Sequence, residues 1–199
     1  TTLANVPNVA PDFDDPKGVP IDAIIFGGRA RDREPLIRAI TDLAEGVDGL
    51  LRYDPMSMRP FMSYPEGAYA AHWLKIIGSA ATPPIFAHVN WFQKDPGDGH
   101  YLWPGYRENL RPLLWLLRLK EGGVRGRQTP VGVIPAEGEL DLDGVSIPSE
   151  DLAAVLSIDT ERWKQEMKYR EQHLEQFPDL PPEIWEAHRR VAAALDEAG

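Results

Sequence analysis

The residues best suited to ligand chemistry lie between His88 and Asn109, in the stretch HVNWFQKDPGDGHYLWPGYREN. This stretch holds five of the eighteen aromatic residues of the chain, and the segment KDPGDG divides them into two groups. Proline and glycine interrupt a sheet and favour a turn near solvent, so we expect a surface hairpin with aromatic rings on both arms. Rings on opposite arms can enclose a planar base, and each stacked base contributes about 1–3 kcal/mol. The alternative is structural, with the same rings filling a small core beneath the loop.

Asn109 follows these rings at the expected start of a helix. Its carboxamide combines a hydrogen-bond donor with an acceptor, which is the pattern needed to read the edge of a purine. The residue type and its place therefore favour base binding by the hairpin.

A second candidate is the segment FGGRARDRE, residues 26–34, which places two glycines and three arginines between an expected strand and an expected helix. Backbone at such a turn approaches an anion closely, and arginine donates two parallel hydrogen bonds to phosphate. Arg29, directly after the glycines, is the candidate catalytic residue. Alternatively, these arginines pair with Asp32 and Glu34 in a tight turn. The motif GxxxxGK[ST] is absent, so the main cradle for any bound phosphates lies elsewhere.

The sequence predicts no metal site within the chain. Its five histidines are scattered, and none pairs at the i, i+4 spacing that brings two imidazoles to one metal on a helix. We expect His173 and His188, which lie among charged residues, on solvated helix faces. The segment ELDLDGVSIPSE, residues 139–150, matches a calcium-loop template except at its first position. Prolines and a glycine precede it where that motif requires a helix, so we reject the match.

Several elements must position these candidates. The apolar run 21–28 predicts a buried strand that ends in the double-glycine turn, and the alternation in 85–92 predicts a strand leading into the hairpin. Further strands are expected at 49–55 and 129–135, and helices at 34–45, 66–77, 108–120, 160–176 and from 181 onward. The pattern indicates an α/β fold: a mixed sheet with flanking helices and an α-helical C-terminal tail.

Boundaries and packing follow from the same patterns. We expect an extended linker over residues 1–20, an α/β nucleotide-binding portion over 21–148 and a helical subregion over 149–199. In the helix 108–120, four leucines are expected to be buried: Leu113, Leu114, Leu116 and Leu117. Asp159 is expected to cap the helix that follows it, and Gly122 to end the leucine-rich one.

Composition excludes several classes of partner. The formal charge is −10, which disfavours nucleic acid and anionic lipid in general. There is no cysteine, so disulfides and thiolate sites are impossible, and a reducing compartment is expected. No apolar run approaches the roughly 20 residues needed to span a bilayer, and the first residues lack the features of a signal peptide. We expect a cytoplasmic protein without nucleic acid or membrane partners.

Three stretches together resemble the C-terminal part of GTP-dependent phosphoenolpyruvate carboxykinase: GVPIDAIIFGGR, RYDPMSMRPFMSYPEGAYAAHWL and HVNWFQKDPGDGHYLWPGYREN. The later TPVGVIP and LDLDGV follow that family's ending, so the resemblance spans nearly the whole chain. It implies conversion of oxaloacetate and GTP to phosphoenolpyruvate, GDP and carbon dioxide, with manganese at the active site and a magnesium-bound nucleotide. It also implies a monomeric intact enzyme whose only partners are these small molecules.

The resemblance assigns roles to individual residues. It places guanine between aromatic rings of the block from Phe92 to Tyr106, makes Asn109 a base contact, and matches Arg29 to an arginine that contacts the transferred phosphate. The implied nucleotide-binding set is Phe92, Tyr101, Tyr106, Arg107, Glu108 and Asn109.

Departures from the family pattern qualify this assignment. Tyr101 and Tyr106 stand where the family often has phenylalanine, so added hydroxyls alter hydrogen bonding in the base slot. A Gly/Ala-rich lid loop is expected before the segment RYDP, yet LAEGVDGLLRYDP runs straight across. Either the lid is deleted or it is a mobile loop missing from this sequence, and we expect the second. The family's P-loop lysine and metal ligands lie upstream, so the chain alone should be inactive.

A rival interpretation comes from another class of protein. The hairpin rings can equally belong to a non-catalytic binding module that holds a peptide or another planar ligand. An upstream GK[ST] loop after a strand would support the enzyme, and an unrelated upstream domain would support the module.

Overall fold

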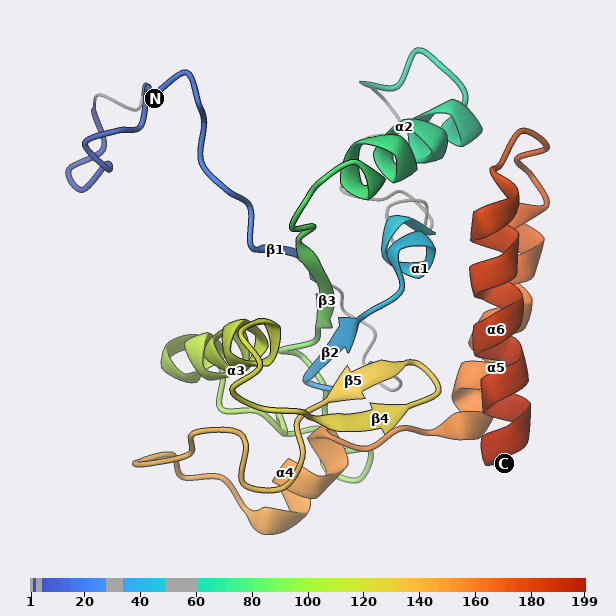
Figure 1. Ribbon diagram of the computed structural model, residues 1–199. Helices are drawn as coiled ribbons and strands as arrows, with labels where there is room; N and C mark the ends of the chain where they lie inside the picture. The colour runs from blue at the N-terminus through green and yellow to red at the C-terminus, as the bar shows by residue number, and fades with distance from the viewer. Residues whose placement is uncertain (1, 3–4, 28–33, 49–60) are drawn as a thin grey trace.

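A computed structural model of the chain describes residues 2, 5–27, 34–48 and 61–199. Its centre is a five-stranded sheet with the order β1-β3-β2-β5-β4 (Figure 1). The strands are β1 (Ala23–Gly27), β2 (Ile37–Ile40), β3 (Ile85–Val89), β4 (Arg127–Thr129) and β5 (Gly132–Ile134). β1 runs parallel to β3, while the other neighbours pair antiparallel. The predicted mixed sheet is therefore confirmed.

Helices cover both faces of this sheet. They are α1 (Leu43–Asp48), α2 (Glu66–Gly78), the 3₁₀ helix η4 (Tyr106–Asn109), α3 (Leu110–Lys120), α4 (Ser149–Val155), α5 (Thr160–Leu174) and α6 (Pro182–Ala198). Figure 1 shows α1, α2 and the antiparallel pair α5 and α6 to one side of the strands, with α3 and α4 to the other. From Ser149 onward every element is a helix, as expected for the C-terminal tail.

The helix ends follow the expected capping chemistry. The carboxylate of Asp159 accepts a hydrogen bond from the backbone N–H of Arg162 at 3.1 Å and so caps α5. Pro182 occupies the first turn of α6, where its missing N–H costs nothing. Gly122 ends α3 with φ of +76°, a left-handed conformation that glycine adopts without steric cost.

The core lies on the two faces of the sheet. On one face Phe26 and Phe86 pack with residues of α2, α5 and α6, including Leu174 and Ile184. On the other face Ala87, Val89 and their neighbours pack with Trp115 and Leu116 of α3. The alternation predicted for 85–92 is thus confirmed in β3. Because the C-terminal helices share the first cluster with β1 and β3, they pack as part of the same core as the sheet.

The helix predicted over 34–45 is wrong. Residues 37–40 form β2, all four buried, and a helix begins only at Leu43. Leu36, Ile37 and Ile40 have helical spacing, but a short apolar run of this kind fits a strand covered on both faces equally well. Arg38, within this strand, is itself 5% exposed and paired with Glu34. The strand predicted over 49–55 lies outside the described residues.

Two predictions of burial need correction: the one for α3 is right for Leu116 but wrong for Leu114 and Leu117, and the one for the two C-terminal histidines is wrong. In α3 the buried residues are Pro112, Trp115 and Leu116, while Leu114 and Leu117 are 47% and 40% exposed. The helix turns a different face to the sheet because Trp115, the bulkiest side chain, takes the central buried position. His173 and His188 are buried, not solvated, because α5 and α6 pack against each other and bury the faces that carry them.

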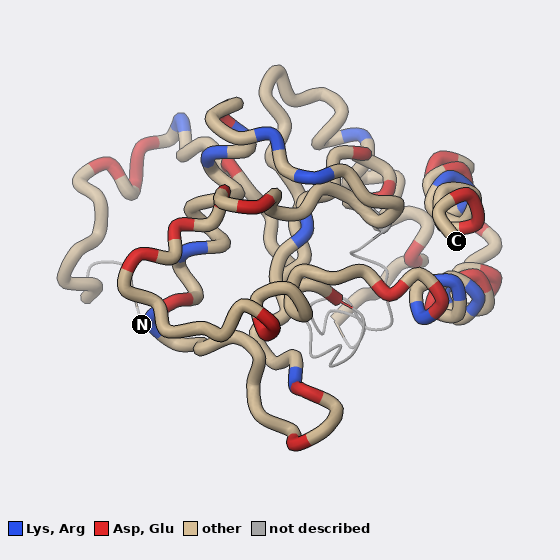
Figure 2. The backbone as a smooth tube through the Cα atoms, turned by 90° about the horizontal axis from the view of Figure 1, so that it is seen from below, with Lys and Arg blue, Asp and Glu red and all other residues tan. Residues whose placement is uncertain are grey.

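Residues 5–22, before β1, form largely exposed turns. No helix among the described residues is long and apolar enough to cross a bilayer. Figure 2 shows acidic and basic residues interspersed along the chain, including the pair of C-terminal helices. The net negative charge is therefore spread over the molecule in this view, with the two signs mixed.

Candidate functional site

The aromatic segment forms the expected hairpin at the end of β3. Lys94 and Tyr101 pair as an antiparallel bridge, and the N–H of Asp95 donates to the carbonyl of His100 at 2.9 Å. In the turn, the Asp95 carboxylate accepts from the N–H of Gly97 at 2.7 Å, which is the usual way an aspartate closes such a loop. The predicted surface hairpin is confirmed, with aromatic rings on both arms.

Phe92 and Tyr101 form a ring pair on the surface of this hairpin. Their centroids are 6.4 Å apart at an interplanar angle of 67°, an edge-to-face arrangement. They are 38% and 54% exposed, so neither ring fills a core. The Lys94 ammonium lies 4.5 Å from the centre of the Tyr101 ring and adds a cation–π contact. The alternative of a small core beneath the loop does not describe these two rings.

Tyr106 is the most exposed large hydrophobic side chain among the described residues, at 94%. Its backbone has φ of +27°, which is unfavourable for any residue with a Cβ, and it follows Gly105 with φ of +75°. Strain of this kind costs on the order of 1–3 kcal/mol, persists where the surrounding structure imposes it, and is concentrated at active sites and ligand-binding segments. The fold therefore holds an aromatic ring in water at an energetic cost, next to the hairpin.

Asn109 ends η4 and stands at the N-cap position of α3. Its side chain makes no capping hydrogen bond. Instead its Oδ1 accepts from the indole N–H of Trp103, at 3.0 Å. Trp103, 1% exposed, lies between the hairpin and η4 and is buried as the structural alternative expected, but sequence reasoning gave it no contact with Asn109. No sequence signal connects these two residues, because their contact depends on the turn between them.

The other two residues of the predicted nucleotide set differ in what they contact. Glu108 is engaged in the structure: its carboxylate accepts from Arg111 at 2.5 Å, and Arg111 also donates to the backbone carbonyls of Asp141 and Asp143. This pair holds the loop after β5 against the start of α3. Arg107 is exposed on η4. Roles for both residues in nucleotide binding stay predictions, and Arg29 lies outside the described residues.

His100 fastens the tip of the hairpin to α4. Its Nδ1 lies 2.6 Å from the Asp98 carboxylate and its Nε2 lies 3.1 Å from the Asp151 carboxylate. Hydrogen bonds to Asp98 and then to Asp151 raise the pKa of His100, because both carboxylates favour the charged imidazolium. The hairpin that carries Tyr101 is therefore held at its tip by an electrostatic contact between segments about fifty residues apart in sequence.

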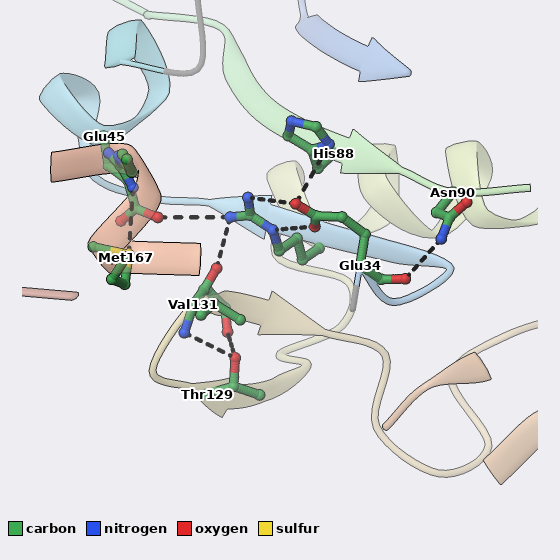
Figure 3. A network of polar contacts seen from close by, with 10 residues as sticks. Glu34, Glu45, His88, Asn90, Thr129, Val131 and Met167 are labelled. Carbon is green, nitrogen blue, oxygen red and sulfur yellow. Dashed lines mark hydrogen bonds and ion pairs between the residues drawn. The ribbon is translucent and has the colours of Figure 1, made fainter. Parts of the chain in front are cut away.

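A buried polar network supports the base of the hairpin (Figure 3). The side chain of Asn90 donates to the backbone carbonyl of Glu34 at 3.0 Å and accepts from the N–H of Phe92 at 3.2 Å. The Glu34 carboxylate accepts from Arg38 at 2.9 Å, and Arg38 also donates to the carbonyl of Val131 at 2.8 Å. These bonds connect Phe92 to the centre of the sheet through groups that are almost completely buried.

The described residues contain one group of side chains that could hold a metal ion, and its members already make other contacts. This group, Asp95, Asp98 and His100, has ligand atoms within 4.8 Å of one another. Both ring nitrogens of His100 already contact carboxylates, and the Asp95 carboxylate closes the turn.

In the rejected calcium loop, the carboxylate of Glu139 accepts hydrogen bonds from the Trp115 indole and from backbone N–H groups that include that of Gly126. Burial opposes ionisation of Glu139, but these bonds outweigh it and lower its pKa. Glu139 is thus a structural carboxylate.

The fold and this site define the class of protein: an α/β domain with a mixed sheet and an exposed aromatic site at the end of β3, an internal strand that runs parallel to β1. Comparison with known proteins identifies the family. The chain belongs to the family described as phosphoenolpyruvate carboxykinase C-terminal P-loop domain, whose model matches residues 1–194.

Relatives named phosphoenolpyruvate carboxykinase [GTP] match most of the chain. The protein from Corynebacterium kroppenstedtii is 39% identical over 205 residues, covering 92% of this chain and 33% of its own length. That from Anaeromyxobacter dehalogenans is 38% identical, covering 89% and 33%, and that from Chlamydia muridarum is 35% identical, covering 97% and 35%. The chain spans about a third of the length of the relatives it matches. The resemblance found in the sequence is confirmed.

The same comparison bears on the lid. The alignment with the Corynebacterium kroppenstedtii protein runs over 205 residues but contains 92% of this 199-residue chain, about 183 residues, so about 22 aligned positions have no counterpart here. Both alternatives for the lid, deletion and a mobile loop missing from this sequence, imply such unmatched positions, so our expectation of a mobile loop stays a prediction.

Proposed function

We propose that this chain is the guanine-nucleotide-binding part of a GTP-dependent phosphoenolpyruvate carboxykinase. The reaction converts oxaloacetate and GTP to phosphoenolpyruvate, GDP and carbon dioxide. The family match and the printed names of the relatives support the reaction class. Because the chain spans about a third of those relatives, the proposal assigns it nucleotide binding and expects no turnover from the chain alone.

The observation that carries the proposal is Tyr106. An aromatic ring that is 94% exposed gains almost nothing from packing within the protein, yet its backbone is held at a positive φ. A planar ligand stacked on the ring would supply the missing contact, at about 1–3 kcal/mol per stacked base. Phe92 and Tyr101 lie on the neighbouring hairpin with accessible rings. We propose that Phe92 and Tyr106 face each other across the base slot.

The phosphate end of the nucleotide is assigned by residue type. Arg107 is exposed on η4, beside the proposed slot, where its guanidinium is free to reach an anion from solvent. Arg29, the proposed phosphate contact, completes this end. In the intact enzyme manganese and magnesium would neutralise charge on the enolate and the phosphates, with ligands supplied by the upstream polypeptide. A monomeric, cytoplasmic enzyme is part of the proposal.

The test is calorimetric titration of the 199-residue chain with GDP and ADP. We expect GDP to bind more tightly than ADP, and Tyr106→Ala to weaken GDP binding by about 5- to 150-fold, which corresponds to 1–3 kcal/mol. Since the ring is exposed, the melting temperature of Tyr106→Ala should not change. Tyr169→Ala removes another exposed tyrosine, on α5, and serves as the control.

Two outcomes would contradict the proposal. Equal affinity for GDP and ADP would favour the rival, a module that binds planar ligands without reading the base. Unaltered GDP binding by Tyr106→Ala would remove the stacking role of that ring. Incubation of the chain with oxaloacetate and GTP should yield no phosphoenolpyruvate.

A further inference from the structure

Asn109 carries the only base-reading carboxamide proposed for the site, and its orientation is fixed by a neighbour. The indole N–H of Trp103 is a donor with no acceptor capacity, so the atom of Asn109 that faces it at 3.0 Å must be the carbonyl oxygen. Trp103 is 1% exposed, and its N–H would otherwise be buried without a partner. The contact therefore fixes which end of the amide faces inward.

The other end of the amide remains available. Asn109 is half-buried and stands where an asparagine would normally cap a helix, but its side chain does not cap α3. No described residue accepts a hydrogen bond from its Nδ2 group. With Oδ1 engaged by Trp103, the Asn109 side chain offers a ligand two donor hydrogens and little acceptor capacity, three residues after Tyr106.

This asymmetry distinguishes the two purines. Guanine carries the acceptor O6 where adenine carries the donor N6 amino group. A fixed donor pairs with O6 and meets the amino group of adenine donor to donor. A freely rotating amide would accommodate either base by turning over.

We propose that Trp103 is a positioning residue that sets the base selectivity of the site by holding the Asn109 amide in the orientation that donates to guanine. The inference rests on the proposed function, because it assigns the selectivity of the same slot. It does not require Trp103 to touch the nucleotide. It predicts that loss of the indole N–H changes the preference between bases more than the affinity for a purine nucleotide as such.

The experiment uses Trp103→Phe, which removes the donor and retains most of the apolar ring. Calorimetric titration with GDP and ADP gives the ratio of the two dissociation constants, and we expect that ratio to fall about fivefold or more, the effect of one hydrogen bond of about 1 kcal/mol. Trp115→Phe is a matched control. Trp115 is equally buried, and its N–H donates to the carboxylate of Glu139, also at 3.0 Å. Its ratio should equal that of the unmodified chain.

A second variant covers the case in which Trp103→Phe does not fold. Asn109→Asp keeps an oxygen for Trp103 and replaces the outward NH₂ group by an acceptor, so it should shift the preference from GDP towards ADP. The inference is overturned if Trp103→Phe retains the unmodified ratio, if it weakens GDP and ADP equally, or if Asn109→Asp still prefers GDP to the same degree. A lack of any base preference in the unmodified chain would instead contradict the proposed function, and this inference with it.

Discussion

Arg38 holds the centre of the buried network behind the site, so its replacement should destabilise the whole chain. It is 5% exposed, and its guanidinium contacts the Glu34 carboxylate at 2.9 Å and the Val131 carbonyl at 2.8 Å. It also lies 3.6 Å from the carboxylate of Glu45 (Figure 3). The ring centre of Trp163 is 4.9 Å from its guanidinium carbon. The side chain thus connects β2 to α1, to the β4–β5 turn and to α5.

Arg38→Met removes the cation of a pair whose carboxylate, on Glu34, is 1% exposed. Breaking a buried pair in this way costs about 3–5 kcal/mol of unfolding free energy. For a chain of this size each kcal/mol lowers the melting temperature by about 2–4 °C, so the expected decrease is roughly 6–20 °C. Burial already raises the pKa of Glu45, opposed by Arg38 and Arg170, so loss of Arg38 would raise that pKa further.

Urea denaturation of a double-mutant cycle measures the effect. Glu34→Gln in the Arg38→Met background removes the buried charge, so it should recover part of the loss and give a coupling energy of about 1–3 kcal/mol. Arg162→Met is the control, because Arg162 pairs with Asp159 on the surface and is 52% exposed. That change should cost no more than about 1 kcal/mol. An equal loss in Arg38→Met and Arg162→Met would refute the argument from burial.

Three further predictions concern pH and backbone geometry. Because the pKa of His100 is raised, its contacts with Asp98 and Asp151 stabilise the fold below pH about 6.5, and this stability is lost as pH rises through the folded-state pKa. The melting temperature of the unmodified chain should therefore decline over that pH range, and His100→Gln should flatten the decline; parallel curves of melting temperature against pH for the two proteins would contradict this. Burial, then Arg170, lowers the pKa of His188 to about 4, so His188→Leu should remove a loss of stability that develops as pH falls from about 6.5 towards 4. Gly132→Ala places a methyl group 2.4 Å from the Ala39 carbonyl oxygen at φ of +121°, so it should lower the unfolding free energy measured in urea by at least about 2 kcal/mol. Gly99→Ala, with open space around the added methyl group, should lower it by only about 1 kcal/mol.

The hairpin was predictable because its signals are local. Proline and glycine in KDPGDG fix the turn, and the alternation in β3 fixes which residues face each side. Caps behave in the same way: Asp159 and Gly122 act on the helix ends next to them. The family resemblance depends on the same contiguous stretches, so it too was available from sequence.

The segment around β2 was not predictable from its own residues. Its apolar spacing fits a helix or a doubly covered strand, and the outcome depends on β3 and β5, which pair with it from positions about fifty and ninety residues further along the chain. In α3 the rotation of the helix was misjudged for a similar reason. The helix offers leucines on more than one face, and only packing against the sheet selects the face that contains Trp115.

By itself, the sequence determined the turns, the helix caps, the family and the residue types gathered at the aromatic hairpin, because each of these depends on neighbours within a few residues. Only the tertiary structure decided that Tyr106 is held exposed at a positive φ, that Trp103 orients Asn109, and that Arg38 and Glu34 form a buried pair at the centre of the sheet. These features depend on side chains that meet through the folded chain. Their energies come from burial and from fixed hydrogen-bond direction, and neither exists in the chain before it folds.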